Sequence, residues 1–180
     1  DGTGVVLVNG EFGERLADQA TRAGLDFNTV RAEWGRALAP AANGAAQSAR
    51  PDVELLWAVH SETSTSILND KDLLNALCRE HDVRLCLDCI SSIGTLPVDL
   101  SGVFLATGVS GKALGAFPGL SMVFYNHPVA PQPTRLPRYL DLGYYAAKDG
   151  VPFTHSSNLL YALRPRSMVQ WGLSVLRAWR

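Results

Sequence analysis

The sequence predicts an α/β fold in which a mostly parallel sheet is covered by helices on both faces. Short apolar runs alternate with amphipathic segments along most of the 180 residues, an alternation typical of β-α-β units. Most of these runs are largely apolar, as expected of strands in a sheet that is covered on both faces. With 47% hydrophobic and 18% charged residues, the chain can bury a sizeable core.

The first two thirds of the chain give clear signals for individual elements. Strands are predicted where the apolar runs occur, at 5–8, 26–30, 55–59, 83–87, 103–107 and 121–125. A helix is predicted at 12–23, where Gly24 ends the periodic pattern. A second helix is predicted at 70–81, with Asn69 or Asp70 as its cap.

Three other regions give weaker signals. Residues 40–50 are rich in Ala, Asn, Gly and Ser and predict a connection or a short helix. The proline-rich stretch after Asn126 predicts a loop. Residues 156–179 have a helical pattern, but Pro165 should break or kink that helix near Arg164.

Composition argues against several classes of function. The formal net charge is -1 and no basic block stands out, so neither nucleic acid nor an anionic membrane surface is an expected partner. No apolar run approaches the ~20 residues of a membrane span. No cluster of His, Cys and Asp has the spacing of metal ligands, so no metal site is expected.

Cysteine usage favours a reducing compartment, and therefore a cytoplasmic location. Cys78, Cys86 and Cys89 are an odd set without the spacing of a disulfide framework. Cys86 and Cys89 form a C-x-x-C pair, but they lie at the end of an apolar run that predicts a buried strand. A redox role for this pair is therefore disfavoured.

Both ends of the chain suggest a piece of a longer protein. It begins at Asp1 rather than at Met and enters the strand at 5–8 almost at once. It ends inside the helical pattern of 156–179.

Polar residues follow three of the predicted strands, where a parallel sheet places its ligands. Hydroxyl groups occur in residues 61–65, Asp88 ends the strand at 83–87, and Lys112 follows the strand at 103–107. Each has a simpler interpretation: a turn or helix-capping segment for 61–65, an N-cap for Asp88, and an exposed surface lysine for Lys112. Together they predict a pocket with an acid, an amine and hydroxyls.

Lys112 also invites comparison with a phosphate-binding loop. Ser110-Gly111-Lys112 carries part of that pattern, but Ala113 follows the lysine where Ser or Thr is required. The small residues before Lys112 instead let a flat ligand approach the backbone closely.

These segments, in this order, resemble the class V aminotransferases of the aspartate-aminotransferase-like fold of pyridoxal-phosphate enzymes. The similar branch is that of the serine–pyruvate, alanine–glyoxylate and aminoethylphosphonate aminotransferases. The resemblance covers about 5–163 and rests on N-G-E-F-G-E-R at 9–15, V-H-S-E-T-S-T at 59–65, L-D-C-I-S-S-I-G at 87–94, S-G-K-A-L at 110–114 and P-G-L at 118–120.

The resemblance implies a role for each matching residue. Lys112 would form the Schiff base with pyridoxal 5'-phosphate and move the substrate proton. Asp88 would pair with the pyridinium nitrogen, Thr63 would bond the 3'-oxygen, and Ile90 would pack on a face of the ring. The two phosphate contacts implied are Ser110 and, from the neighbouring subunit of a homodimer, Thr154.

The sequence also departs from the family pattern. Gly111 stands where Gln is common, Val151 replaces an aromatic residue, and His155 and Ser156 replace prolines. The resemblance places a glycine-rich phosphate loop and a ring-stacking aromatic before Val5. It also implies a small C-terminal domain that supplies a carboxylate-binding arginine. Residues 1–180 are therefore expected to be a partial large cofactor-binding domain, without that small domain.

The expected function is transfer of an amino group between a small amino acid and a 2-oxo acid. One alternative is a pyridoxal-phosphate lyase or cysteine desulfurase on the same fold. Another is a non-catalytic fragment, which the departures at Gly111 and Pro165 favour. Which donor and acceptor are used does not follow from the sequence.

Overall fold

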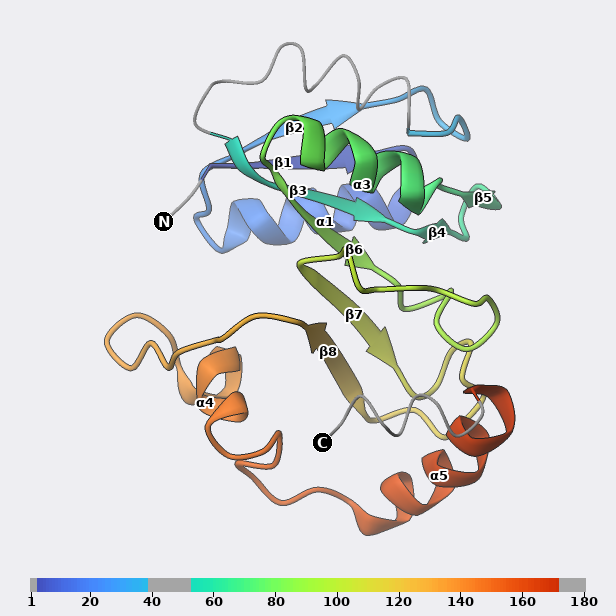
Figure 1. Ribbon diagram of the computed structural model, residues 1–180, viewed down its shortest axis with the longest axis vertical. Coiled ribbons are helices and arrows are strands. Elements are labelled where there is room, and N and C mark those ends of the chain that lie inside the picture. The colour runs from blue at the N-terminus through green and yellow to red at the C-terminus, as the bar shows by residue number, and fades with distance from the viewer. Residues whose placement is uncertain (1–2, 39–52, 172–180) are drawn as a thin grey trace.

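Six strands form the main sheet of the computed structural model, which describes residues 3–38 and 53–171 (Figure 1). In spatial order they are β2 (Phe27–Arg31), β1 (Thr3–Val8), β3 (Val53–Val59), β6 (Arg84–Asp88), β7 (Leu105–Val109) and β8 (Ser121–Tyr125). All neighbouring pairs are parallel except β7 and β8. The predicted mostly parallel α/β sheet is confirmed.

Two helices, α1 (Glu11–Arg22) and α3 (Lys71–Glu80), cover opposite faces of the sheet. Alternation along β1 shows this directly, because successive side chains of a strand point to opposite faces. Val5 and Leu7 belong to the core cluster that contains Leu74 and Cys78 of α3. Val6 and Val8 pack instead with Ala17 of α1. Strand β1 is therefore buried on both faces, as its apolar composition predicts.

Of the two caps predicted for α3, Asp70 is the one used. Its side chain accepts a hydrogen bond from the backbone N–H of Leu73 at 3.0 Å. Asn69 is buried instead and joins the ends of two strands. Its Oδ1 accepts from Nδ2 of Asn9 at 3.0 Å, and its own Nδ2 donates to the Val59 carbonyl at 2.8 Å.

A two-stranded hairpin leaves the carboxyl end of β3. It consists of β4 (Ser61–Glu62) and β5 (Ile67–Leu68), which pair antiparallel. Thr63 lies in the turn between them. The sequence predicts a turn here, and the structure adds the two short strands.

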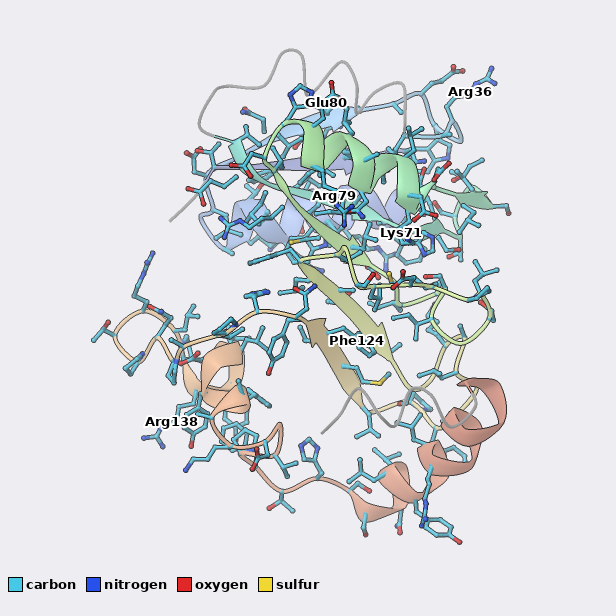
Figure 2. All side chains as sticks on the ribbon, in the orientation of Figure 1. Arg36, Lys71, Arg79, Glu80, Phe124 and Arg138 are labelled. Carbon is cyan, nitrogen blue, oxygen red and sulfur yellow. The ribbon has the colours of Figure 1, made fainter. Side chains whose placement is uncertain are left out.

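Beyond β8 the chain runs away from the sheet in a wide arc (Figure 1). The predicted loop after Asn126 is followed by a 3-10 turn, η1 (Arg138–Leu140), and a short helix, α4 (Leu142–Ala146), which the sequence analysis missed. Asp141 caps α4 by accepting from the Tyr144 N–H at 3.2 Å. Figure 2 shows Arg138 in this region pointing away from the sheet.

The last described helix, α5 (Ser157–Trp171), corrects one prediction. It continues through Pro165, so the predicted break near Arg164 is wrong, whereas a kink at that point stays a prediction. A proline inside a helix removes one N–H donor and its ring clashes with the carbonyl four residues earlier, a cost that a helix can take up by bending rather than by ending. Residues 40–50 lie outside the described part, as does the end of the predicted helix. No helix within 3–38 and 53–171 is long and apolar enough to cross a membrane.

Leu87 provides a test of this core. It is completely buried in the middle of the sheet, on β6. We expect Leu87→Ala to lower the free energy of unfolding by about 2–5 kcal/mol, because transfer and cavity costs add. Leu25, which is 57% exposed, is the control, and Leu25→Ala should change stability by no more than about 0.5 kcal/mol. Urea unfolding followed by circular dichroism measures both, and equal losses would contradict the assignment.

Candidate functional site

The carboxyl ends of three neighbouring strands meet at one edge of the sheet. Val59 of β3 pairs with Asp88 of β6, and Asp88 pairs in turn with Thr107 of β7. The residues after these strands therefore lie side by side: His60 donates its N–H to the Asp88 carbonyl at 2.9 Å, and Cys89 donates to the Thr107 carbonyl at 3.0 Å. The predicted convergence of polar strand ends is thus present in the fold.

Asp88 lies half-buried at the centre of this edge. Its Oδ1 accepts the backbone N–H of Ile90 at 2.9 Å. Burial raises the pKa of Asp88 above its ordinary value; the Ile90 hydrogen bond and the charge of Lys112 oppose the shift, and the negative charge of Glu62 adds to it. A carboxylate in this setting gains most from a cation that binds directly against it.

Lys112 lies on a tight turn between β7 and β8. Ser110, which is fully buried, organises this turn: its hydroxyl donates to the Phe117 carbonyl at 2.7 Å and accepts from the Leu120 N–H at 3.2 Å. The Ser110 hydroxyl therefore already has two partners in its own loop, and a phosphate contact would have to share or replace one of them.

Gly111 is explained by the same turn. A Cβ at this position would lie 2.5 Å from Cβ of Pro118 and 2.6 Å from its Cα. Because the second contact is with backbone, a side chain at 111 would force the turn to move. The departure from Gln noted in the sequence is therefore matched by the local packing of this chain.

The Lys112 side chain is directed toward the start of α1. Its Nζ lies 5.8 Å from the centre of the Phe12 ring, and Cζ of Arg15 lies 5.1 Å from the same centre. Both distances fall within the range of a cation–π contact. Residue 12 is 100 positions from Lys112 and was missed as a site residue; its only signal was its place in the N-G-E-F-G-E-R segment.

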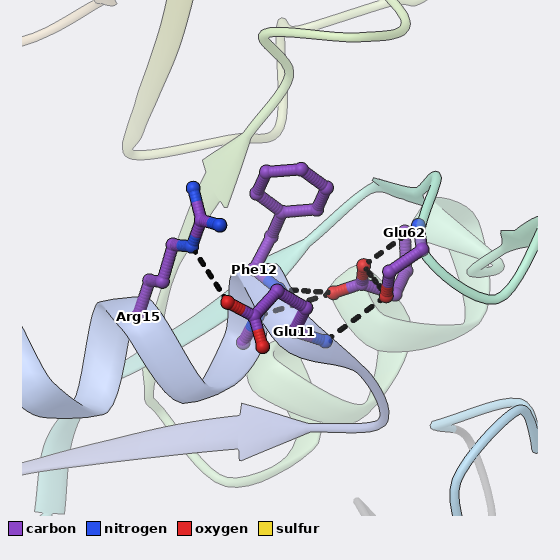
Figure 3. A network of polar contacts seen from close by, with 6 residues as sticks. Glu11, Phe12, Arg15 and Glu62 are labelled. Carbon is purple, nitrogen blue, oxygen red and sulfur yellow. Dashed lines mark hydrogen bonds and ion pairs between the residues drawn. The ribbon is translucent and has the colours of Figure 1, made fainter.

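Glu62 is the second residue whose role the sequence analysis missed. It is fully buried beside Thr63, yet its carboxylate is well bonded. Oε2 accepts the N–H groups of Phe12 at 3.0 Å and Gly13 at 3.1 Å, and Oε1 accepts the Ser64 hydroxyl at 2.6 Å (Figure 3). The first turn of α1 is thus capped by a residue about 50 positions away, and Thr63 stands exposed on the adjoining turn.

The loop after β6 packs against the loop that carries Lys112. Gly94, at φ +105°, lies so close that a Cβ there would be 3.0 Å from the backbone N of Leu114. Ile90 is half-buried in the first part of this loop. His60 binds it from the β3 side, with Nδ1 2.8 Å from Oγ of Ser92. Burial, and then the charge of Lys71, lower the pKa of His60, as suits a histidine with a structural role.

Thr154 is separate from the other candidates. It is exposed on the segment between α4 and α5. Among the contacts of residues 3–38 and 53–164, no hydrogen bond or ion pair joins it to Asp88, Lys112 or Thr63. The fold thus brings Asp88, Ile90, Ser110 and Lys112 to one sheet edge with Thr63 on the adjoining hairpin, while Thr154 lies elsewhere.

The cysteines lie in the core rather than in the site. All three are free and buried, and burial raises the pKa of Cys78 and Cys89 to about 12 and that of Cys86 to about 11. We expect all three to react with a thiol reagent such as iodoacetamide at neutral pH at least about 100-fold more slowly than in the urea-unfolded chain, because thiolate is the reactive form and burial blocks access. Rapid labelling of Cys86 or Cys89 in the folded protein would reinstate a redox pair.

The donor set at this edge fits a flat, cationic, aldehyde-bearing cofactor. Lys112 offers an amine, Phe12 an aromatic face, Thr63 an exposed hydroxyl, and Asp88 a half-buried carboxylate that a ring N–H⁺ would satisfy. The described residues contain no group of three or more His, Cys, Asp and Glu side chains that could hold a metal ion.

The amino-acid sequence is similar to those of several known proteins. The chain is 36% identical over 168 residues to the "Soluble hydrogenase 42 kDa subunit" of Anabaena cylindrica, a match that covers 86% of this chain and 43% of that protein. It is 39% identical over 121 residues to the 2-aminoethylphosphonate–pyruvate transaminase of Burkholderia ambifaria, covering 65% and 32% respectively. The chain matches none of the protein-family profiles.

Several solved structures with the same fold are aminotransferases. Alanine–glyoxylate aminotransferase from Nostoc sp. superposes with a TM-score of 0.75 at 30% identity, over 93% of this chain and 47% of that one. An aspartate aminotransferase of subgroup IV from Thermus thermophilus gives 0.77 at 28% identity, over 98% and 51%. The chain therefore spans about half the length of these proteins, or less. The resemblance to the class V, pyridoxal-phosphate-dependent aminotransferases is confirmed in sequence and in fold.

Proposed function

Because this chain is similar to the class V aminotransferases in sequence and in fold, we propose that it forms part of the large domain of a pyridoxal-phosphate-dependent aminotransferase. One observation carries the proposal: Lys112 Nζ lies against the Phe12 ring while Asp88 lies half-buried at the neighbouring strand end. An amine, an aromatic face and a carboxylate are the groups that hold the aldehyde, the ring and the ring nitrogen of that cofactor.

Each site residue has a role under this proposal. Lys112 Nζ attaches the cofactor covalently and later moves the proton at the substrate Cα. Asp88 keeps the ring nitrogen protonated, and Thr63 donates to the 3'-oxygen. Phe12 and Ile90 pack against the ring. Pyridoxal phosphate, when bound, would supply an electron sink for the reaction at the substrate Cα.

The groups near Lys112 that could bind the phosphate of the cofactor already have hydrogen-bond partners within the chain. Ser110 lies beside Lys112, but its hydroxyl has two partners within its turn. The start of α1, a natural anion site, is already capped by Glu62. The phosphate therefore needs partners beyond these groups, and Thr154 of a neighbouring subunit is the proposed one.

A homodimer follows from that assignment. Thr154 is exposed and apart from Lys112, as expected of a residue that serves a partner's site. Tyr139, Leu140 and Val151, in the same part of the chain, are large apolar residues that are also exposed, at 71%, 73% and 59%. Analytical ultracentrifugation tests the proposal, and a monomer at micromolar concentration would overturn it.

The proposed substrates are a small amino acid and a 2-oxo acid, and the proposed location is the cytoplasm. Three free, buried cysteines are consistent with a reducing compartment. None of these three cysteines is the mobile thiol that a desulfurase needs.

An exchange assay separates amino transfer from the alternatives. A full-length form of the protein is incubated with pyridoxal phosphate, alanine, and glyoxylate or pyruvate, and the amino group is followed between the acids. Exchange supports the proposal. Release of ammonia or sulfide without exchange would indicate a lyase or a desulfurase, and a protein that stays colourless with excess cofactor would indicate a non-catalytic chain.

A further inference from the structure

Helix α1 begins without a cap of its own. The residue at its N-cap position is Gly10, which has no side chain to bond the free N–H groups of the first turn. Such groups must be satisfied, since a buried, unbonded N–H costs free energy. The Glu62 carboxylate accepts those of Phe12 and Gly13, and the Ser64 hydroxyl accepts that of Glu11 at 3.0 Å.

The fit between these segments leaves no spare room. A Cβ on Gly10 would lie 2.5 Å from Cδ of Glu62 and 2.7 Å from Oγ of Ser64. Oε1 of Glu62 accepts both the N–H and the hydroxyl of Ser64, at 3.2 and 2.6 Å. The carboxylate is therefore held on both oxygens, and it fixes the hairpin turn and the first turn of α1 against each other (Figure 3).

We call the contacts of the Glu62 carboxylate with the hairpin turn and the first turn of α1 the clamp. Phe12 connects this clamp to the candidate site. Its backbone N–H is bonded by Glu62, and its ring faces Nζ of Lys112. We propose that Glu62 is a positioning residue of the cofactor site: its buried carboxylate anchors the start of α1 so that the Phe12 ring is held at Lys112. The positioning role of Glu62 rests on the proposed function, whereas the clamp itself does not.

The clamp is tested without any cofactor. Glu62→Gln keeps the size of the side chain but places an NH₂ group where one oxygen accepted hydrogen bonds. We expect amide exchange at Glu11, Phe12 and Gly13 to become about 10-fold faster in the intact chain, the scale of one lost cap. Glu14→Gln is the matched control, because Glu14 lies on the same helix but is bonded to Arg31 on the surface. Unchanged exchange in Glu62→Gln would overturn the clamp.

The positioning role is tested with pyridoxal phosphate as the probe. We expect Glu62→Gln to bind it about 10-fold more weakly and to reduce the visible circular dichroism of the lysine-bound chromophore, which reports how the ring is held. Glu14→Gln should behave as the wild type. In a Phe12→Leu background, Glu62→Gln should cause no further loss of affinity or dichroism, since both changes act on the same contact of the Phe12 ring.

The outcomes separate this inference from the proposed function. If the wild-type protein forms no chromophore, the proposed function fails while the exchange data still decide the clamp. If Glu62→Gln loosens the helix but leaves affinity and dichroism unchanged, Glu62 is merely a structural cap and the positioning role is overturned. Losses that add fully in the Phe12→Leu background would likewise overturn it, because Glu62 would then act by another route.

Discussion

Lys112→Ala should abolish the visible absorbance of the cofactor-loaded protein and lower the rate of amino exchange by at least about 10²–10⁴-fold, the usual contribution of a positioned acid–base group. Two functions are lost together, since Nζ of Lys112 is both the point of covalent attachment and the proposed carrier of the substrate proton. The turn itself should survive, because Ser110 and Gly111 shape it through contacts that do not involve the lysine side chain.

The matched control is Lys148→Ala, which removes an exposed lysine after α4. It should leave the absorbance and the exchange rate unchanged. An ultraviolet–visible spectrum with excess pyridoxal phosphate, followed by borohydride reduction and mass mapping of the modified peptide, gives the answer. Modification at a lysine other than 112, or an intact chromophore in Lys112→Ala, would remove the site from this edge of the sheet.

The fold could be predicted largely from local patterns. Each strand of the sheet carries its own signal, because apolar runs such as 5–8 and 83–87 can be stable only when both faces are covered. Local patterns did not predict that the helix continues through Pro165, because a proline signals either an end or a bend and its local sequence does not decide between them. Helix α4 was missed because it has five residues and its cap, Asp141, follows a stretch dominated by prolines.

The candidate site was predictable only in part, for a related reason. Asp88 and Lys112 could be predicted because each follows a strand that its own local sequence marks, and ligands bind at such strand ends in a parallel sheet. Phe12 and Glu62 could not, because their roles arise from contacts across 100 and 50 positions in the chain. The glutamate follows the strand at 55–59 and has no helical pattern of its own, so nothing local marks it as the cap of a distant helix.

Asp88→Asn should have opposite effects on stability and on cofactor binding. The amide oxygen can still accept the Ile90 N–H, so the loop after β6 should keep its shape. Without the negative charge, however, the site loses a charge-assisted bond to the ring nitrogen, worth about 1.5–3 kcal/mol. We expect pyridoxal phosphate to bind about 10- to 100-fold more weakly, and amino exchange to fall further because the ring nitrogen is no longer held protonated.

In the cofactor-free protein, the same substitution should raise stability rather than lower it. Because burial raises the pKa of Asp88, the charged form is less favourable in the fold than in the unfolded chain, so Asp88 lowers stability at neutral pH. That penalty is relieved as the pH falls through the raised pKa. Asp88→Asn should therefore have a higher free energy of unfolding than the wild type at pH 7, and the difference should vanish below about pH 4. Asp18→Asn, at an exposed site on α1, is the control. A destabilised Asp88→Asn at pH 7 would mean that the carboxylate already has a cationic partner within the chain, and would contradict its assignment to the ring nitrogen.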